Sequence, residues 1–143
     1  MIDLTSQTLH DIVPPMNSFQ QDVRDFNQAM GFGHPTDPSI ERYPFQLRCD
    51  LILEEAHEFV EACKDPNWVE MIDALIDLLY VTFGALDAMG VDATLFWDEV
   101  HRSNMLKLGP DGQPIRRADG KITKPEGWQP PDIAKVLRML TSR

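Results

Sequence analysis

Residues 47–63 read LRCDLILEEAHEFVEAC, and this stretch decides the fold because its helical repeat carries acids where apolar side chains are expected. At about 100° per residue, one helix face carries Leu47, Leu51, Glu55, Glu58 and Ala62, with Glu54 at its edge. Desolvating an ionised carboxylate without a partner costs on the order of several kcal/mol. Acids on a face that should pack therefore indicate bound cations.

A second acidic face follows in residues 68–90, WVEMIDALIDLLYVTFGALDAMG. Here Glu70, Asp73 and Asp77 share one side of the helix, while apolar residues cover another. The spacing is E-E-x-x-E, then eleven residues, then E-x-x-D. Neither acidic run contains the lysine or arginine that an ordinary solvated face would be expected to carry. Carboxylate oxygens without thiolates suit hard divalent ions such as Mg²⁺ or Mn²⁺.

The size and charge of the chain narrow the class of protein. Its 143 residues suit a single domain over residues 1–143, since domains of about 100–200 residues are usual. The net charge of −10 argues against a nucleic-acid backbone as partner, which would require a basic stripe. No stretch has the features of a secretory signal or approaches the ~20 apolar residues that span a membrane.

The two cysteines indicate a reducing compartment. Cys49 and Cys63 lie 14 residues apart in one predicted helix, which separates them by roughly 21 Å along its axis. A disulfide needs Cα atoms within about 7 Å, so the two cannot bridge each other. We therefore expect reduced thiols in a cytoplasmic protein.

Turn and cap signals divide the chain into helices. We expect an arm over 1–16, a first helix from Asn17 or Ser18 to Gly31, a second from about Ile40 to Cys63, a third from Asp65-Pro66 to Gly90, a fourth from Asp92 to Leu108, a basic Gly- and Pro-rich loop over 109–131 and a last helix over 132–140. The short connection makes the second and third helices antiparallel neighbours, so their acidic faces share one cleft. The predicted fold class is all-α, a four-helix bundle with a short extra C-terminal helix.

The motifs resemble those of a known superfamily, the all-α nucleoside triphosphate pyrophosphohydrolases. Its MazG-like, dimeric-dUTPase-like and phosphoribosyl-ATP pyrophosphohydrolase-like members carry E-E-x-x-E followed by E-x-x-D on the next helix. Glu54, Glu55 and Glu58 match the first motif, and Glu70 and Asp73 match the second. The stretches DALIDLLYVTFGALDAMGVD, EVHRSNMLKL, DGK and KPEGWQPPD look like small bacterial and phage members, and the resemblance covers about residues 17–140.

One position departs from the pattern. In relatives whose third helix reads E-x-x-D-L-L-Y, the ligating aspartate maps to Asp77, and the glutamate three residues earlier maps to Ala74. Either the motif has moved one turn to Glu70 and Asp73, or Asp73 replaces the missing glutamate. Asp73 and Asp77 are four residues apart and can reach one ion together, so we favour the second arrangement, which leaves Glu70 in doubt.

The resemblance implies cleavage of a nucleoside triphosphate, of dUTP, dCTP or dGTP type, into a monophosphate and pyrophosphate in a bacterial or phage-infected cytosol. Two or more Mg²⁺ or Mn²⁺ ions would be held by Glu55, Glu58, Asp73 and Asp77, with Glu70 as the open alternative. One ion would lower the pKa of a bound water. Glu54, beside Glu55 in the catalytic cluster, would orient or deprotonate that water.

Part of the triphosphate charge would not be neutralised by the metal ions, and the basic side chains that could pair with it lie late in the chain. The S-N-M-x-K and D-G-K motifs recur in the resembled family and indicate Asn104, Lys107, Lys121 and Lys124 as substrate contacts, with Arg102 beside them. Candidates for the base are Phe19, Gln20, Asn27, Tyr80 and Trp128. The apolar stripe of the first helix and Trp97 offer surface for a homodimer or homotetramer, as in relatives.

Two other classes of protein also fit parts of the pattern. A di-iron carboxylate bundle uses Glu-x-x-His pairs, and Glu54-x-x-His57 and Asp98-x-x-His101 have that spacing. However, His57 lies roughly 100° from Glu58 around the helix and points off the acidic face. A helical antitoxin-like module that binds a nucleotide without turnover is the non-enzymatic alternative.

Overall fold

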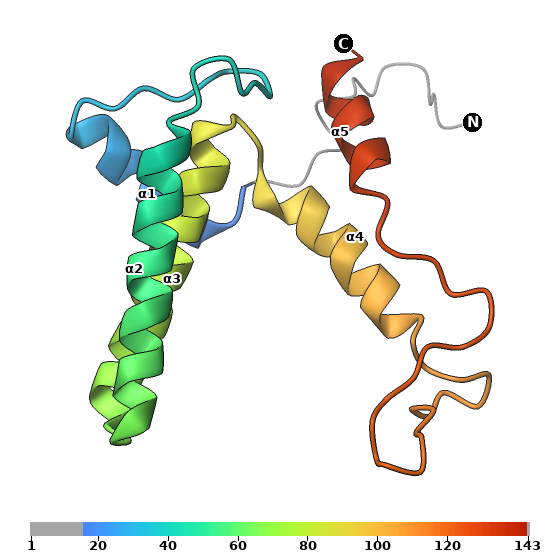
Figure 1. Cartoon of the computed structure of the whole chain (residues 1–143). Helices are drawn as coiled ribbons and strands as arrows, with labels where there is room; N and C mark the ends of the chain where they lie inside the picture. The colour runs from blue at the N-terminus through green and yellow to red at the C-terminus, as the bar shows by residue number, and fades with distance from the viewer. Residues whose placement is uncertain (1–15, 143) are drawn as a thin grey trace, which may run out of the picture. The chain divides into compact units, whose positions relative to one another are not determined.

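The computed structural model describes residues 16–142, and every regular element in this range is a helix (Figure 1). The five helices are α1 (Ser18–Ala29), α2 (Phe45–Lys64), α3 (Trp68–Ala88), α4 (Ala93–Met105) and α5 (Ile133–Thr141). Their number, order and type confirm the all-α prediction, including the short C-terminal helix. The predicted N-terminal arm lies outside the described residues except for Met16.

Three helices begin at side-chain caps, whereas α2 begins at Phe45, later than the predicted start near Ile40, and has no side-chain cap at Pro44. The side chain of Asn17 accepts a hydrogen bond from the backbone N–H of Gln20, and Asp132 caps α5 through the N–H of Lys135. The predicted start of α3 at Asp65-Pro66 is wrong by two residues. Asn67 is the cap, because its side-chain oxygen accepts from the N–H groups of both Val69 and Glu70.

The chain divides into two compact units, one ending at Thr94 and the other beginning at Leu95. Unit 1 contains α1, α2 and α3. The three-residue connection 65–67 turns the chain back, so α2 and α3 form an antiparallel hairpin, and α1 packs on α3 (Figure 1). The expectation of a single domain over 1–143 stays a prediction.

The interior of unit 1 is built around small residues and a few buried polar groups. Val23, Ala74 and Ala85 are buried, while Arg24 Nε forms a 2.6 Å ion pair with buried Asp87. Gln20 is fully buried, and its amide donates to Val91 O and accepts from Ala93 N–H, each at 2.8 Å. These hydrogen bonds connect α1 to residues 91–93, which follow α3 in the chain.

The linker between α1 and α2 is fastened to the end of α3. Ser39 N–H donates to Met89 O at 2.9 Å. Gly90 has φ +70°, and a Cβ added there would come within 2.7 Å of Asp37 O. Both the backbone conformation and the close approach therefore require glycine at this position.

Unit 2 consists of α4, a long loop and α5. Ser103 is fully buried, its hydroxyl donates to Gln129 O at 3.0 Å, and its carbonyl accepts from Trp128 Nε1 at 2.8 Å. The loop contains only isolated β-bridges, between Leu108 and Pro114 and between Arg116 and Ile122. The residues of the predicted basic loop are thus folded back onto α4 through Trp128 and Gln129.

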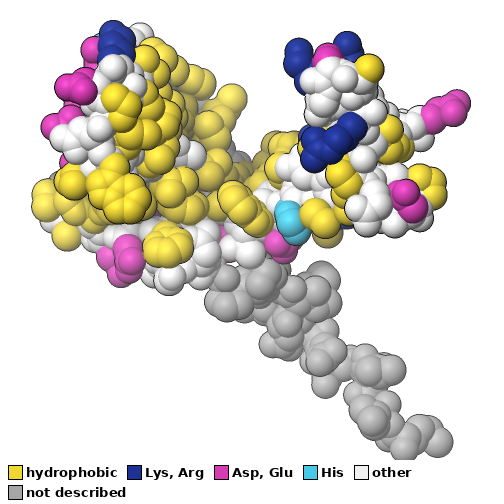
Figure 2. Space-filling view, turned by 90° about the horizontal axis from the view of Figure 1, so that it is seen from below, with side chains coloured by type: hydrophobic (Ala, Val, Ile, Leu, Met, Phe, Trp, Pro, Cys, Tyr) yellow, Lys and Arg dark blue, Asp and Glu magenta, His cyan; other side chains and the backbone are white. Residues whose placement is uncertain are grey.

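Many large apolar side chains of unit 1 are exposed. On α3 the exposed set includes Trp68 (76%), Val69 (69%), Ile72 (50%), Ile76 (56%) and Leu79 (52%). Figure 2 shows one surface of this unit, where many hydrophobic side chains (yellow) lie next to one another. No single helix among residues 16–142 is long and apolar enough to cross a membrane. Taken together, α3 and α4 have enough length and apolar character to do so, but a sharp bend separates them.

Candidate active site

The acidic faces of α2 and α3 meet around Glu55. The pKa of Glu55 is raised, first by partial burial and then by the negative charges of Glu58, Asp77, Glu54 and Asp73. Two of these carboxylates belong to α2 and two to α3. The hairpin therefore concentrates five acids, Glu55 included, in one region of unit 1.

Glu70 does not belong to this group. Arg48 on α2 lies against Gly84 on α3, and in an antiparallel hairpin the same pairing places Glu55 opposite Asp77 and Ala62 opposite Glu70. Glu70 is thus seven residues from Asp77, about 10.5 Å along the axis. It is absent from the charges that act on Glu55. This geometry supports the arrangement in which Asp73 and Asp77 act together.

The donor chemistry of the acidic group fits a hard divalent cation. All five side chains offer carboxylate oxygens, which Mg²⁺ and Mn²⁺ prefer. Burial and, after it, the charges of four neighbouring carboxylates raise the pKa of Glu55, and a bound cation would neutralise these charges. In the arrangement seen across residues 16–142, no three acidic, histidine or cysteine side chains lie close enough together to enclose an ion.

Four of the predicted substrate contacts form one cluster in unit 2. Lys107 Nζ donates to Asn104 Oδ1 at 2.7 Å. The ammonium groups of Lys107 and Lys124 lie 5.4 Å and 4.0 Å from the centroid of the Trp128 ring. Two lysines that are 17 residues apart in sequence thus lie within cation–π distance of one aromatic ring.

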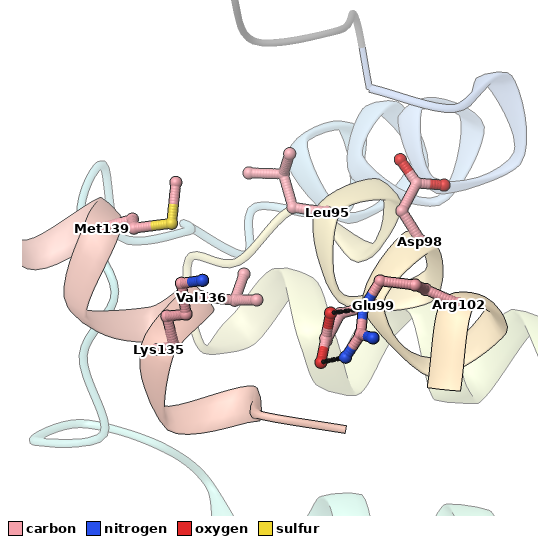
Figure 3. A pocket seen from close by; sticks show the side chains of 7 residues that line it. All are labelled: Leu95, Asp98, Glu99, Arg102, Lys135, Val136 and Met139. Atoms are coloured by element: carbon pink, nitrogen blue, oxygen red, sulfur yellow. Dashed lines mark hydrogen bonds and ion pairs between the residues drawn. The ribbon is translucent and has the colours of Figure 1, made fainter. Parts of the chain in front are cut away.

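The other two basic candidates lie outside this cluster. The guanidinium of Arg102 donates two 2.7 Å hydrogen bonds to the carboxylate of Glu99, beside a cavity of about 430 Å³ between α4 and α5 (Figure 3). Lys121 is exposed, and its backbone, not its side chain, bonds to Asp119 and Arg117. Arg102 is therefore paired with Glu99 in this structure, although its side chain is 53% exposed.

The predicted base contacts in unit 1 differ in how accessible their side chains are to a ligand. Asn27 is buried on α1, and Phe26 beside it meets Tyr80 of α3 edge to face, with ring centroids 5.8 Å apart. Tyr80 follows Asp77 by three residues, so these two side chains are neighbours on the surface of α3. The prediction for Gln20 is wrong, because both ends of its buried amide are bonded to backbone. Phe19 is largely exposed.

Arg48 is a functional candidate that the sequence interpretation missed. It lines a second cavity, of about 510 Å³, and its Nε is buried without an acceptor among the described residues. A signal was present in the sequence, since Arg48 precedes Glu55 by seven residues and shares its helix face.

The histidines of the di-iron alternative do not join the acidic group. His57 is exposed and lies 3.6 Å from Glu61, on another side of α2. His101 is exposed on α4 in unit 2. The carboxylates around Glu55 thus have no histidine partner among the described residues.

Comparison with known proteins places the chain in a family. The sequence profile of the phosphoribosyl-ATP pyrophosphohydrolase family matches residues 23–104, which include α2, α3 and every acid of the group. The chain therefore belongs to the phosphoribosyl-ATP pyrophosphohydrolase family, within the all-α MazG-like superfamily. A stretch of 79 residues is 37% identical to the uncharacterized protein L479 of Acanthamoeba polyphaga mimivirus, covering 50% of this chain and 31% of that relative. Membership supports a pyrophosphohydrolase type of activity in general.

Proposed function

We propose that this protein is a metal-dependent nucleoside triphosphate pyrophosphohydrolase. It cleaves a ribo- or deoxyribonucleoside triphosphate between the α- and β-phosphates, giving a monophosphate and pyrophosphate. The observation that carries the proposal is the shared negative charge around Glu55, to which two helices contribute, in a chain of this family. Such a concentration of acid is suited to binding a polyanion through divalent cations.

Each acid has a proposed role. Glu55, Glu58, Asp73 and Asp77 would hold two or more Mg²⁺ or Mn²⁺ ions, and the bound ions would offset the triphosphate charge and lower the pKa of a coordinated water. Glu54, exposed beside Glu55, accepts the proton of the water that attacks phosphorus. The bond to the bridging oxygen breaks, and pyrophosphate leaves with the electron pair.

Side chains of unit 2 are proposed to contact the phosphates. Asn104, Lys107 and Lys124 present an amide and two cations around the ring of Trp128, and Lys121 adds an exposed cation in the same loop. Hydrogen bonds between ammonium groups and phosphate oxygens are among the stronger polar contacts in proteins. The cluster therefore suits the part of the triphosphate charge that bound cations leave uncovered.

A panel of nucleoside triphosphates tests the reaction. The full chain is incubated with each nucleotide and Mg²⁺ or Mn²⁺, and the products are identified by phosphorus NMR. Equal amounts of monophosphate and pyrophosphate are expected, and activity disappears when EDTA is added. Release of orthophosphate as the first product would contradict the cleavage site.

Binding without turnover would favour the antitoxin-like module, and iron in the purified protein would favour the di-iron class.

The exposed apolar face of α3 is proposed to pack against a second copy of the chain, in a homodimer or homotetramer. A two-fold axis brings identical patches together, so one face running along a helix covers its own counterpart. Trp68, Ile72 and Ile76 of this helix are 76%, 50% and 56% exposed, and groups of exposed apolar side chains mark interaction sites. The exposed thiols of Cys49 and Cys63 and the net charge of −10 are compatible with a cytosolic protein that does not bind nucleic acid.

A further inference from the structure

A cavity in unit 1 has no role in the proposed phosphate chemistry. It has a volume of about 510 Å³, and its walls come from the α1–α2 linker, the first turn of α2 and Ala88 near the end of α3. Phe32, Tyr43 and Leu47 give it an apolar lining. Its charged lining residues are Glu41, Arg42 and Arg48. Small-molecule sites typically combine a volume of about 300–1,000 Å³ with apolar walls and a few polar groups.

The environment of the Arg48 side chain at this cavity is unfavourable for its charge and for its hydrogen-bond donors. Its Nε is buried, yet no acceptor among the described residues bonds to it. Arg48 also lies in the first turn of α2, where the helix dipole disfavours a cation. A bound acceptor reaching the guanidinium through the cavity would offset both costs.

Gly84 makes room for this arginine. A Cβ at position 84 would come within 2.9 Å of Arg48 Nη1, and Val23 of α1 lies 3.6 Å away. The guanidinium therefore lies across α3 at the one glycine of that helix. Because the nearest atom is the end of a flexible side chain, alanine at 84 would displace Arg48 while leaving the backbone in place.

The cavity and the acidic group have a fixed spacing along the hairpin. Arg48 precedes Glu55 by seven residues, which places both on one face of α2 about 10.5 Å apart. Gly84 follows Asp77 by the same number on α3. This distance is comparable with the length of a nucleoside, so phosphates near Glu55 would leave the base near Arg48.

We propose that this cavity holds the nucleobase and that the Arg48 guanidinium donates to two adjacent acceptors on one edge of it. The inference rests on the proposed function and names the class of base. An arginine has donors only, so it matches O6 and N7 of guanine or O2 and N3 of cytosine. Adenine places an amino donor beside N7, and uracil and thymine separate their carbonyls by an N–H group.

Binding of monophosphates to the metal-free full chain tests the proposal without relying on turnover. Isothermal titration with dGMP, dCMP, dAMP and dTMP is expected to show preference for dGMP or dCMP, and the panel identifies which. Arg48→Gln should weaken the preferred ligand about 5- to 150-fold and leave the others nearly unchanged. Inorganic pyrophosphate is the further probe. If Arg48→Gln weakened the binding of pyrophosphate by the same factor as that of the preferred monophosphate, Arg48 would be a phosphate contact. That result would overturn the base assignment.

Gly84→Ala provides a second perturbation that keeps the guanidinium but moves it. It should reproduce the selective loss seen with Arg48→Gln, and it keeps the test valid if that variant folds poorly. Gly33→Ala is the matched control, because Gly33 lines the same cavity and an added Cβ there meets nothing within 4 Å. Arg138→Gln controls for net charge on the exposed surface of α5.

The outcomes separate this inference from the reaction itself. Equal affinity of the wild type for all four monophosphates, or no effect of either variant, overturns the base assignment even if triphosphates are cleaved. Conversely, selective binding through Arg48 in a protein that cleaves no triphosphate supports the cavity assignment and contradicts the proposed function.

Discussion

At the scale of single residues, Glu55 is affected by the negative charges of four neighbouring carboxylates. Burial and four neighbouring carboxylates raise its pKa, so its ionised form is disfavoured in the metal-free protein. Three of these neighbours, Glu58, Asp73 and Asp77, are proposed to bind the divalent cations together with Glu55. One side chain therefore links the stability of the hairpin to the chemistry proposed for it.

Glu55→Gln and Glu58→Gln each remove one negative charge and keep the side-chain shape. We expect loss of metal-dependent hydrolysis, with a melting temperature of the metal-free variant at neutral pH equal to or above that of the wild type, because carboxylate repulsion is relieved. Turnover assays and thermal melts without and with millimolar Mg²⁺ measure both effects. Wild type should gain melting temperature from Mg²⁺ and the variants should gain less.

Glu61→Gln is the matched control on the same helix. Glu61 accepts from Lys64 and lies near His57, away from the acidic group, and these partners lower its pKa. It should therefore keep full activity and the full response to Mg²⁺. Wild-type turnover in either Glu55→Gln or Glu58→Gln would rule out the proposed role of the acidic group.

The shifted motif on α3 gives a second residue-scale prediction. Asp73→Asn and Asp77→Asn should each abolish metal-dependent hydrolysis, because both carboxylates act on Glu55, while Glu70→Gln should have a mild effect. Initial rates at saturating Mg²⁺ decide between the assignments. A Glu70→Gln protein as inactive as Asp77→Asn would place the ion one turn nearer the start of α3.

Residues with distant partners were the hardest to predict from sequence. The acidic side chains were found because their spacing repeats within single helices and their neighbours follow from a short connection. Gln20 was assigned wrongly because its partners, Val91 and Ala93, are 71 and 73 residues along the chain. Arg48 was missed for the same reason, since its position depends on Gly84 and Val23.

At the scale of elements, helix bounds were predictable wherever the cap is local. Asn17, one of the two predicted cap candidates, caps α1, and Asp132, where the last helix is predicted to begin, caps α5. The start of α3 was misplaced because Asp65-Pro66 and Asn67 offer competing cap chemistry within three residues. Which of them caps the helix depends on how the turn is closed, where Asn67 N–H bonds to Ala62 O.

The contact between α4 and α5 should depend on pH through Glu99. Two hydrogen bonds from Arg102 and one from the backbone N–H of Asp132 lower the pKa of Glu99 from 4.5 to about 2. A lowered carboxyl pKa contributes stability above the ordinary value of 4.5, and that contribution is lost as the pH falls towards 2. The amide resonance of Asp132 should report this titration by NMR.

Glu99→Ala tests the same contact at neutral pH. The variant should weaken the helical signal of α5 and remove the low-pH titration at Asp132, because the acceptor of that amide is gone. Asp98→Ala, at the neighbouring position of the same cavity, is the control and should keep both. A wild-type Asp132 amide that titrates near pH 4.5 would contradict the assigned pairing.

At the scale of the whole molecule, the uncovered side of α3 predicts self-association. Ile72→Glu and Ile76→Glu place charges within the proposed interface and should shift the protein towards monomer in sedimentation velocity. Ile122→Glu changes an equally exposed isoleucine in the loop of unit 2 and should leave the oligomer intact. A wild type that sediments as a monomer at micromolar concentration would contradict the proposal.

The antiparallel pairing of α2 and α3 also limits how the gene can change. Inserting one codon within either helix would rotate all residues on one side of the insertion by about 100°. Arg48 would then leave Gly84, or Glu55 would leave Asp77, and no single later substitution could restore both. Length variation in descendants of this chain should therefore be found at the turn over 65–67 and in the linker before Pro44, with the helical segments of the hairpin kept at constant length.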